Sequence, residues 1–106
     1  LIWGGQSNAN DLYLAPTLLE APNMDNPLWK EEIFGPLLLI KTFDSIQDVP
    51  AIIEQNPYPL ALYLYTGSKA NEQFITQTVR FGGGCINNGL IHLGNNNLPF
   101  GGVGYS

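Results

Sequence analysis

The sequence predicts an α/β fold with parallel strands in the order β-α-β-α-β. Apolar runs occupy residues 37–43 and 60–65, residues 83–87 read as a third strand, and two short amphipathic segments lie between the three. Apolar runs without polar alternation are typical of strands buried on both faces of a parallel sheet. Strands that alternate with helices in this way predict right-handed crossover connections. No internal repeat or linker interrupts the chain, so we expect one α/β unit.

The N-terminal third has a less regular pattern. Residues 1–7 hold a short apolar run followed by two glycines and polar side chains, and residues 13–19 read as an extended segment. Because Pro16 has no backbone N–H, it favours an edge position in a sheet. Residues 22–29 are rich in proline, asparagine and aspartate, a composition that predicts a loop.

Two short amphipathic helices are expected between the three strands. Asp48 can cap the first helix, which tolerates Pro50 because the N–H groups of a first turn lack helical partners. Ser68 can cap the second helix, and Gly82 can supply its left-handed C-cap. Each helix has an apolar stripe, formed by Val49, Ile52 and Ile53 in the first and by Phe74, Ile75 and Val79 in the second.

A three-stranded parallel sheet made from this segment alone would leave apolar faces or edges uncovered. We therefore expect a larger parent protein, or a partner, to cover them. The chain begins at Leu1 and ends at Ser106, without an initial methionine or a charged tail, and both ends look like cuts through a longer protein.

Composition narrows the class of protein. The formal net charge is −5 with four cationic side chains, which argues against nucleic acid or an anionic membrane surface as the main partner. No apolar run reaches the length of a membrane span, and the N-terminus does not resemble a signal peptide. Cys85 is the only cysteine, which fits a reducing compartment, so we expect a cytoplasmic protein. His92 is the only histidine, and no metal site is expected.

The hexapeptide Glu-Glu-Ile-Phe-Gly-Pro at residues 31–36 stands directly before the first apolar run. Its Gly-Pro end predicts a turn that presents a carboxylate and an aromatic ring close together. A carboxylate can accept hydrogen bonds from the hydroxyls of a ribose, and a ring can pack against nicotinamide. The alternative is that Glu31 and Glu32 are solvated surface residues and that Phe34 belongs to the core.

From Leu90 onward the sequence predicts an irregular segment. Three consecutive asparagines and a glycine-rich end disfavour regular structure, yet Leu98, Phe100 and Val103 keep the segment partly apolar. A long irregular segment beside a parallel sheet is often a binding loop.

The hexapeptide at 31–36 is similar to a signature of the aldehyde dehydrogenase superfamily. Further matching stretches occur in family order, namely Gly4-Gly5, 16–19, 60–63, 83–87 and 99–104. The ordered set covers nearly the whole chain and resembles the C-terminal part of the family's catalytic domain. The ending at 103–106, with Asn87 and His92 upstream, most resembles the branch that acts on fatty and aromatic aldehydes. Asn88 departs from the aspartate often found in that branch.

The resemblance assigns roles to particular residues. It implies that Glu32 binds the nicotinamide ribose hydroxyls of NAD or NADP and that Phe34 packs near the nicotinamide ring. It implies that Phe100 lines the tunnel for a small-molecule aldehyde. His92 is read either as a hydrogen-bonded structural histidine or as a residue near the substrate entrance. The family's main nucleotide-binding domain is expected outside this segment, because Gly82-Gly83-Gly84 lacks the dinucleotide-binding spacing.

The family mechanism is covalent: a cysteine thiolate attacks the aldehyde, hydride passes to NAD(P)+, and a water activated by a glutamate releases the acid. The nucleophile and this glutamate are expected upstream of Leu1, so no catalytic residue is assigned to this chain. Cys85 is not assigned as the nucleophile, because it lies in a predicted buried strand without a base or cation beside it in sequence.

Three alternatives remain open at this stage. In the first, the parent protein is an acylating or phosphate-linked reductase, and in the second it is a non-catalytic homologue that serves as a binding or structural module. In the third, the chain itself is a free-standing α/β binding domain. Under the favoured reading, the 106-residue chain alone is expected to be inactive. The resemblance also implies that the parent protein is a homodimer or larger homo-oligomer.

Overall fold

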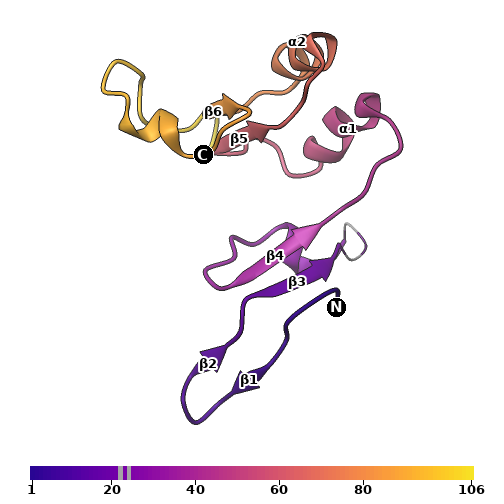
Figure 1. Ribbon diagram of the computed structural model, residues 1–106, viewed down its shortest axis with the longest axis vertical. Helices are drawn as coiled ribbons and strands as arrows, with labels where there is room; N and C mark the ends of the chain where they lie inside the picture. The colour runs from indigo at the N-terminus through magenta and orange to yellow at the C-terminus, as the bar shows by residue number, and fades with distance from the viewer. Residues whose placement is uncertain (22, 24) are drawn as a thin grey trace. The chain divides into compact units, whose positions relative to one another are not determined.

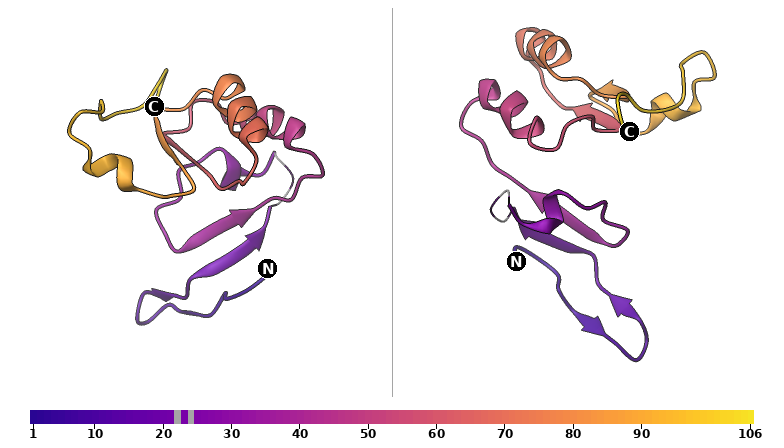
Figure 2. Two further views of the ribbon diagram at one scale, coloured as in Figure 1. Left: turned by 45° about the horizontal axis from the view of Figure 1, so that its top comes forward. Right: turned by 180° about the vertical axis from the view of Figure 1, so that it is seen from behind.

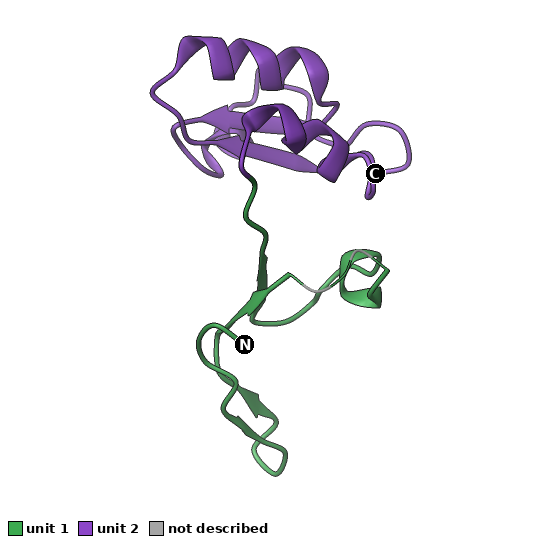
Figure 3. Cartoon of the chain, turned by 90° about the vertical axis from the view of Figure 1, so that its right-hand side faces the viewer, with its two compact units in different colours: residues 1–43 green, residues 44–106 purple. Residues whose placement is uncertain are grey.

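The fold was analysed in a computed structural model that describes residues 1–21, 23 and 25–106 (Figure 1). The chain divides into two compact units, residues 1–43 (unit 1) and residues 44–106 (unit 2), which Figure 3 shows in different colours. Figure 2 gives two further views of the ribbon. Each unit contains a pair of parallel strands, so the predicted α/β class with parallel strands is confirmed. In the described part of the chain, no helix is long and apolar enough to cross a membrane.

Unit 1 combines a short hairpin with a parallel strand pair. Strand β1 (Ser7–Asn8) pairs antiparallel with β2 (Tyr13–Leu14). Strand β3 (Thr17–Glu20) pairs in parallel with β4 (Leu37–Ile40), and the 3-10 helix η1 (Pro27–Trp29) lies in the connection between them. The loop predicted at 22–29 thus contains η1, while positions 22 and 24 lie outside the described residues.

The start of β3 is fixed by the buried side chain of Thr17. Its Oγ1 accepts a hydrogen bond from the N–H of Gly5 at 3.0 Å and donates one to the carbonyl of Ala15 at 2.7 Å. Gly4 has a φ of 82°, and a Cβ at this position would collide with the carbonyl oxygen of Pro16. The two glycines are therefore needed for the close approach between the N-terminal segment and β3.

Unit 2 is a β-α-β arrangement preceded by a short helix. Strand β5 (Ala61–Leu64) pairs in parallel with β6 (Gly83–Ile86), and α2 (Lys69–Thr78) connects them. The 3-10 helix η2 (Ile46–Asp48) leads into α1 (Val49–Ile53), which contacts α2, and both helices lie side by side in Figures 1 and 2. A further 3-10 helix, η3 (Ile91–Gly94), follows β6.

The helix boundaries confirm one predicted cap and correct two others. The Ser68 hydroxyl accepts a hydrogen bond from the N–H of Asn71 at 3.3 Å, as expected for an N-cap. Asp48 does occupy the N-cap position of α1, but its carboxylate accepts from the N–H of Ser45, one turn earlier, and makes no capping bond to α1. Helix α2 ends at Thr78 with an extended Val79, so Gly82 is not its C-cap.

Strand pairing differs from the expected order at β4. The strand ends at Ile40, before the predicted Phe43, and its residues alternate between half-buried and exposed instead of being buried on both faces. Its hydrogen-bonded neighbour is β3, whose start follows Pro16 in the segment expected to be extended. Strands β5 and β6 are half-buried along their whole length.

Few apolar side chains of the described residues are buried. Ile75 and Val79 of the predicted α2 stripe are 1% and 7% exposed, and Ala15 is 6% exposed. Many large apolar side chains stay exposed, among them Leu12, Leu38, Ile40, Phe43, Leu60 and Leu90. This surface agrees with the expectation that a sheet built from this segment alone leaves apolar area uncovered.

Candidate functional site

A cavity of about 480 Å³ lies in unit 2, between the starts of β5 and β6 and the irregular segment that follows β6. Its wall is largely apolar, and leucines at positions 60, 90, 93 and 98 contribute to it. Polar groups come from His92, Asn95 and Asn96. Ligand sites typically combine such a volume and apolar wall with a few polar groups, so this cavity is the candidate site.

His92 projects from η3 over one face of β6. Its Nδ1 lies 3.6 Å from the Sγ of Cys85, and its ring centroid is 5.7 Å from that of Tyr63 with a tilt of 52°. A Cβ at Gly83 would lie 2.6 Å from the His92 Cδ2 atom, so the ring sits directly on the strand backbone. The histidine is thus held by β6 and β5 while it lines the cavity.

Phe100 lines the same cavity from the segment 99–101, and its side chain is 90% exposed. Gly101 next to it has a φ of 137°, a conformation that favours glycine. A Cβ at Gly82 would lie 2.7 Å from the carbonyl oxygen of Gly101, which shows that this segment passes closely over the start of β6. Phe100, which the resemblance places in the aldehyde tunnel, thus lines the same cavity as His92, which was read either as a structural histidine or as a residue near the substrate entrance.

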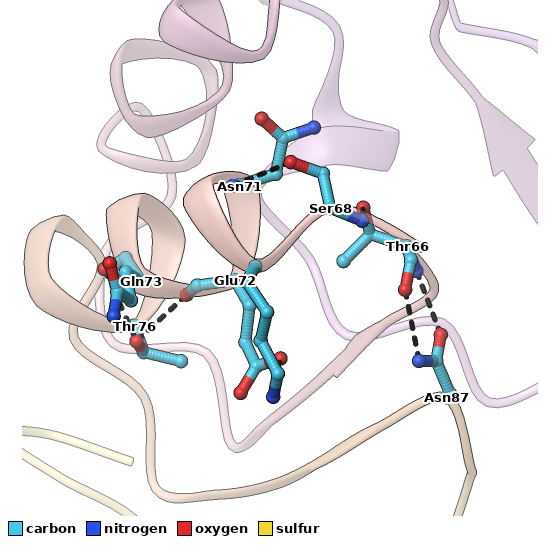
Figure 4. A network of polar contacts seen from close by, with 8 residues as sticks. Thr66, Ser68, Asn71, Glu72, Gln73, Thr76 and Asn87 are labelled. Carbon is cyan, nitrogen blue, oxygen red and sulfur yellow. Dashed lines mark hydrogen bonds and ion pairs between the residues drawn. The ribbon is translucent and has the colours of Figure 1, made fainter.

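Asn87 directly follows β6 and holds the start of the irregular segment that borders the cavity, residues 87–104, which we call the cavity segment (Figure 4). Its side-chain Oδ1 accepts from the N–H of Thr66 at 2.8 Å, and its Nδ2 donates to the carbonyl of Thr66 at 2.9 Å. Its own N–H donates to the carbonyl of Leu64 at 2.8 Å. The amide thus joins the ends of β5 and β6 immediately before the turn that leads to η3.

Glu32 and Phe34 lie in unit 1, in the turn that leads into β4. Both side chains are exposed, and Phe34 is 91% exposed, so the alternative that places Phe34 in the core is wrong for this chain. The end of the turn is anchored because the N–H of Thr17 donates to the carbonyl of Pro36 at 2.8 Å. The turn thus presents a carboxylate and a ring on the surface of unit 1, and their closeness to each other stays a prediction.

Cys85 has a neighbour that sequence reasoning missed. The expectation that no base stands beside it holds along the sequence, but in space His92 contacts its sulfur. The two residues are seven positions apart and meet because the chain reverses through η3, for which no periodicity gives a signal. Cys85 is half-buried in β6. Gly83 and His92 line the cavity, but Cys85 does not. Among the residues that the structure describes, no three His, Cys, Asp or Glu side chains form a metal-binding group.

Comparison with known proteins gives consistent matches. The sequence model described as aldehyde dehydrogenase family matches residues 1–106. The chain is 44% identical over 106 residues to the 4,4'-diaponeurosporen-aldehyde dehydrogenase of Staphylococcus aureus, covering 100% of this chain and 23% of that protein. A substrate-bound state of Staphylococcus aureus AldH has a TM-score of 0.85 at 42% identity, over 97% of this chain and 22% of the other.

A more distant structural relative is an indole-3-acetaldehyde dehydrogenase in complex with NAD+. It has a TM-score of 0.80 at 29% identity, over 95% of this chain and 21% of the other. The chain thus spans about a quarter or less of the length of the relatives that it matches. The family model covers every residue, and the match to the first relative extends over the whole chain. The family suggested by the ordered motifs is therefore confirmed, and the chain belongs to the aldehyde dehydrogenase family.

Proposed function

We propose that the protein to which this chain contributes oxidises an aldehyde to a carboxylic acid with NAD(P)+. Residues 1–106 form the C-terminal part of its catalytic domain in this proposal. The observation that carries it is the largely apolar cavity of about 480 Å³, which is bordered by His92 and by Gly83 and Phe100 of the stretches 83–87 and 99–104 that resemble the family's signatures. A cysteine thiolate outside this chain attacks the aldehyde carbon and forms a thiohemiacetal. Loss of hydride to the nicotinamide leaves a thioester, and water hydrolyses the thioester to the acid and frees the thiol.

Within this reaction, the cavity residues of unit 2 bind and orient the aldehyde. The leucines and the Phe100 ring contact the hydrocarbon part of the substrate and exclude water from it. The apolar wall favours the fatty or aromatic aldehydes of the branch that the sequence resembles, and one relative is named for a 4,4'-diaponeurosporen aldehyde. Small polar aldehydes would gain little from such a wall.

The turn at Glu32 and Phe34 fits a nicotinamide ribose and ring. The fit rests on the exposure of both side chains, which leaves the carboxylate free to accept ribose hydrogen bonds and the ring free to stack. NAD(P)+ supplies the hydride acceptor when it is bound. Glu32 then fixes the ribose, and Phe34 limits the positions that the nicotinamide can adopt. A relative of 29% identity is named as a complex with NAD+, which supports a nicotinamide dinucleotide as the cofactor.

The proposal extends to assembly and location. The exposed apolar side chains of both units suit burial within the parent protein, which we propose to be a cytoplasmic homo-oligomer. The single free thiol of Cys85 fits a reducing compartment.

The test is a steady-state assay of the purified full-length protein with NAD+ and NADP+ and a series of aldehydes. The proposal expects aldehyde-dependent formation of reduced nicotinamide and of the matching acid. A folded full-length protein that reduces neither cofactor with any aldehyde would contradict it and favour a binding or structural module. The 106-residue chain serves as a second sample, and we expect it to be inactive because the proposed nucleophile lies outside it.

A further inference from the structure

Two adjacent glycines at the start of β6 serve different parts of the cavity wall. The backbone of Gly101, the residue that follows Phe100, passes so close to Gly82 that a Cβ at Gly82 would lie 2.7 Å from the Gly101 carbonyl oxygen. Gly83 receives the ring of His92, because a Cβ there would lie 2.6 Å from Cδ2 and 2.7 Å from Nε2. Contacts of this length are too short for a real Cβ, so the ring occupies space that any other residue at position 83 would need.

The other edge of the His92 ring is held independently. Residues 83 and 85 point to the same face of β6, because side chains alternate along a strand. The ring therefore spans both positions, with Nδ1 against the sulfur of Cys85 and the Nε2 edge over Gly83. Tyr63 is the register partner of Cys85 on β5, and its ring packs against His92. The ring thus lies against the sheet, and only its approach at position 83 requires the absence of a side chain.

The three glycines of this stretch differ in what an added methyl group would strike. At Gly84 a Cβ would collide with the carbonyl oxygen of Leu62, which is backbone, so the β5–β6 pair would be distorted. At Gly83 the atoms in the way belong to the end of a flexible side chain. A methyl group at position 83 therefore displaces the His92 ring by about 1 Å, to ordinary van der Waals contact, and leaves the strand in place.

We propose that Gly83 sets the depth of the cavity through the His92 ring, and is thereby a specificity-determining residue for the aldehyde. The inference rests on the proposed function for its substrate. Gly83 and His92 both line the cavity, so a ring lifted off β6 moves into the space that the aldehyde would occupy. Bulky aldehydes, which need the full depth, are excluded by that movement, whereas small aldehydes are not. The His92 side chain acts here as a movable wall and not as an acid or base.

The test compares four variants of the full-length protein: Gly83→Ala, His92→Ala, the double variant, and Gly94→Ala as the matched control. Gly94 lies in the same 3-10 helix as His92, and a methyl group there meets no atom within 4 Å. The probes are 2-naphthaldehyde as the bulky aldehyde and propanal as the small one. Two quantities are measured for each probe, the dissociation constant by ligand-observed NMR and kcat/KM with NAD(P)+.

For Gly83→Ala we expect the affinity for 2-naphthaldehyde and the kcat/KM with this aldehyde to fall at least about tenfold. The affinity for propanal and the kcat/KM with propanal should change less than about twofold. Gly94→Ala should behave as the unmodified protein. In the His92→Ala background, adding Gly83→Ala should no longer change the ratio between the two probes, because the displaced ring is absent. If the effect of Gly83→Ala disappears in the His92→Ala background, the displaced His92 ring causes it, and a general loss of structure does not.

Two results would overturn the inference: equal losses for both aldehydes in Gly83→Ala, or a persistent loss for 2-naphthaldehyde when His92 is already alanine. Failure of the proposed function looks different. In that case neither aldehyde is oxidised by any variant, while the dissociation constants still report whether position 83 controls the depth of the cavity.

Discussion

Replacement of Ile75 by alanine tests whether α2 is held in place by the buried stripe that the sequence predicts. Ile75 is 1% exposed and is the largest fully buried side chain among the described residues. The change removes three buried carbon atoms, worth about 0.8 kcal/mol each, or about 2.4 kcal/mol in transfer free energy. The cavity that remains raises the cost, so we expect a loss of about 2 to 5 kcal/mol.

The assay is backbone amide hydrogen exchange of α2 in the full-length protein. Exchange reports the free energy of local opening, and each 1.4 kcal/mol corresponds to a tenfold change in rate. Ile75→Ala should therefore accelerate exchange of the α2 amides by about 30-fold to several thousand-fold. The control is Gln77→Ala on the exposed face of the same helix, for which about twofold or less is expected. Equal exchange in the two variants would refute the argument that Ile75 anchors the helix.

Three further changes test the turn, the N-terminal segment and the helix cap. Glu32→Gln should raise the KM for NAD(P)+ of the full-length protein about 10-fold or more, because hydrogen bonds to a charged group contribute about 1.5 to 3 kcal/mol. Glu31→Gln in the same exposed turn is the control and should change this KM little. Gly4→Ala should lower the melting temperature well below that of Gly67→Ala, because position 4 combines a φ of 82° with a blocked Cβ and position 67 has open space; equal melting temperatures would argue against the close approach. Ser68→Ala should destabilise α2 by about 1 kcal/mol, read as faster hydrogen exchange in its first turn, and unchanged exchange there would show that the cap contributes nothing.

Local signals carried most of what the sequence predicted correctly. Ser68 and the stripe with Ile75 lie within one helix, so the capping preference and the 3.6-residue period were enough to place α2. Strand β5 was found because its apolar run at 60–65 is continuous and bounded by turn residues, and β6 lies within residues 83–87, which were read as a strand. The C-cap at Gly82 was wrong because glycine is also required where two backbones approach, and the sequence does not distinguish the two uses.

Long-range contacts explain what the sequence did not predict. Strands β3 and β4 pair in parallel although residues 21–36 separate them along the chain. Because β3 is only four residues long and follows Pro16, no local pattern of residues indicates this pairing. The contact between Cys85 and His92 depends on how η3 turns, and a cavity has no signature in a pattern of residues. For the candidate site, the residue roles came from the family resemblance, while the structure showed that His92 and Phe100 line one cavity.

Two of the strained non-glycine residues of unit 2 lie at the start of the cavity segment, and the third contacts the segment where it returns. Among the described residues of this unit, the non-glycine residues with positive φ are Tyr58, Asn87 and Leu90, with values of 64°, 54° and 60°. Asn87 and Leu90 stand where the segment begins. Where it returns, the Tyr58 ring leaves no room for a side chain at Gly104 and makes an edge-to-face contact with Tyr105, with centroids 5.6 Å apart.

Such conformations cost about 1 to 3 kcal/mol each and persist only where surrounding contacts fix them. Here the contacts are the Asn87 amide at one end and the Tyr58 ring at the other. Between these fixed ends the segment buries little, since Phe100 is 90% exposed and Leu98 is 50% exposed. A core loop would show the reverse, with buried side chains and relaxed ends. Fixed ends and an exposed apolar middle suit a cavity wall whose apolar side chains are covered by a bound aldehyde and by the rest of the proposed parent protein.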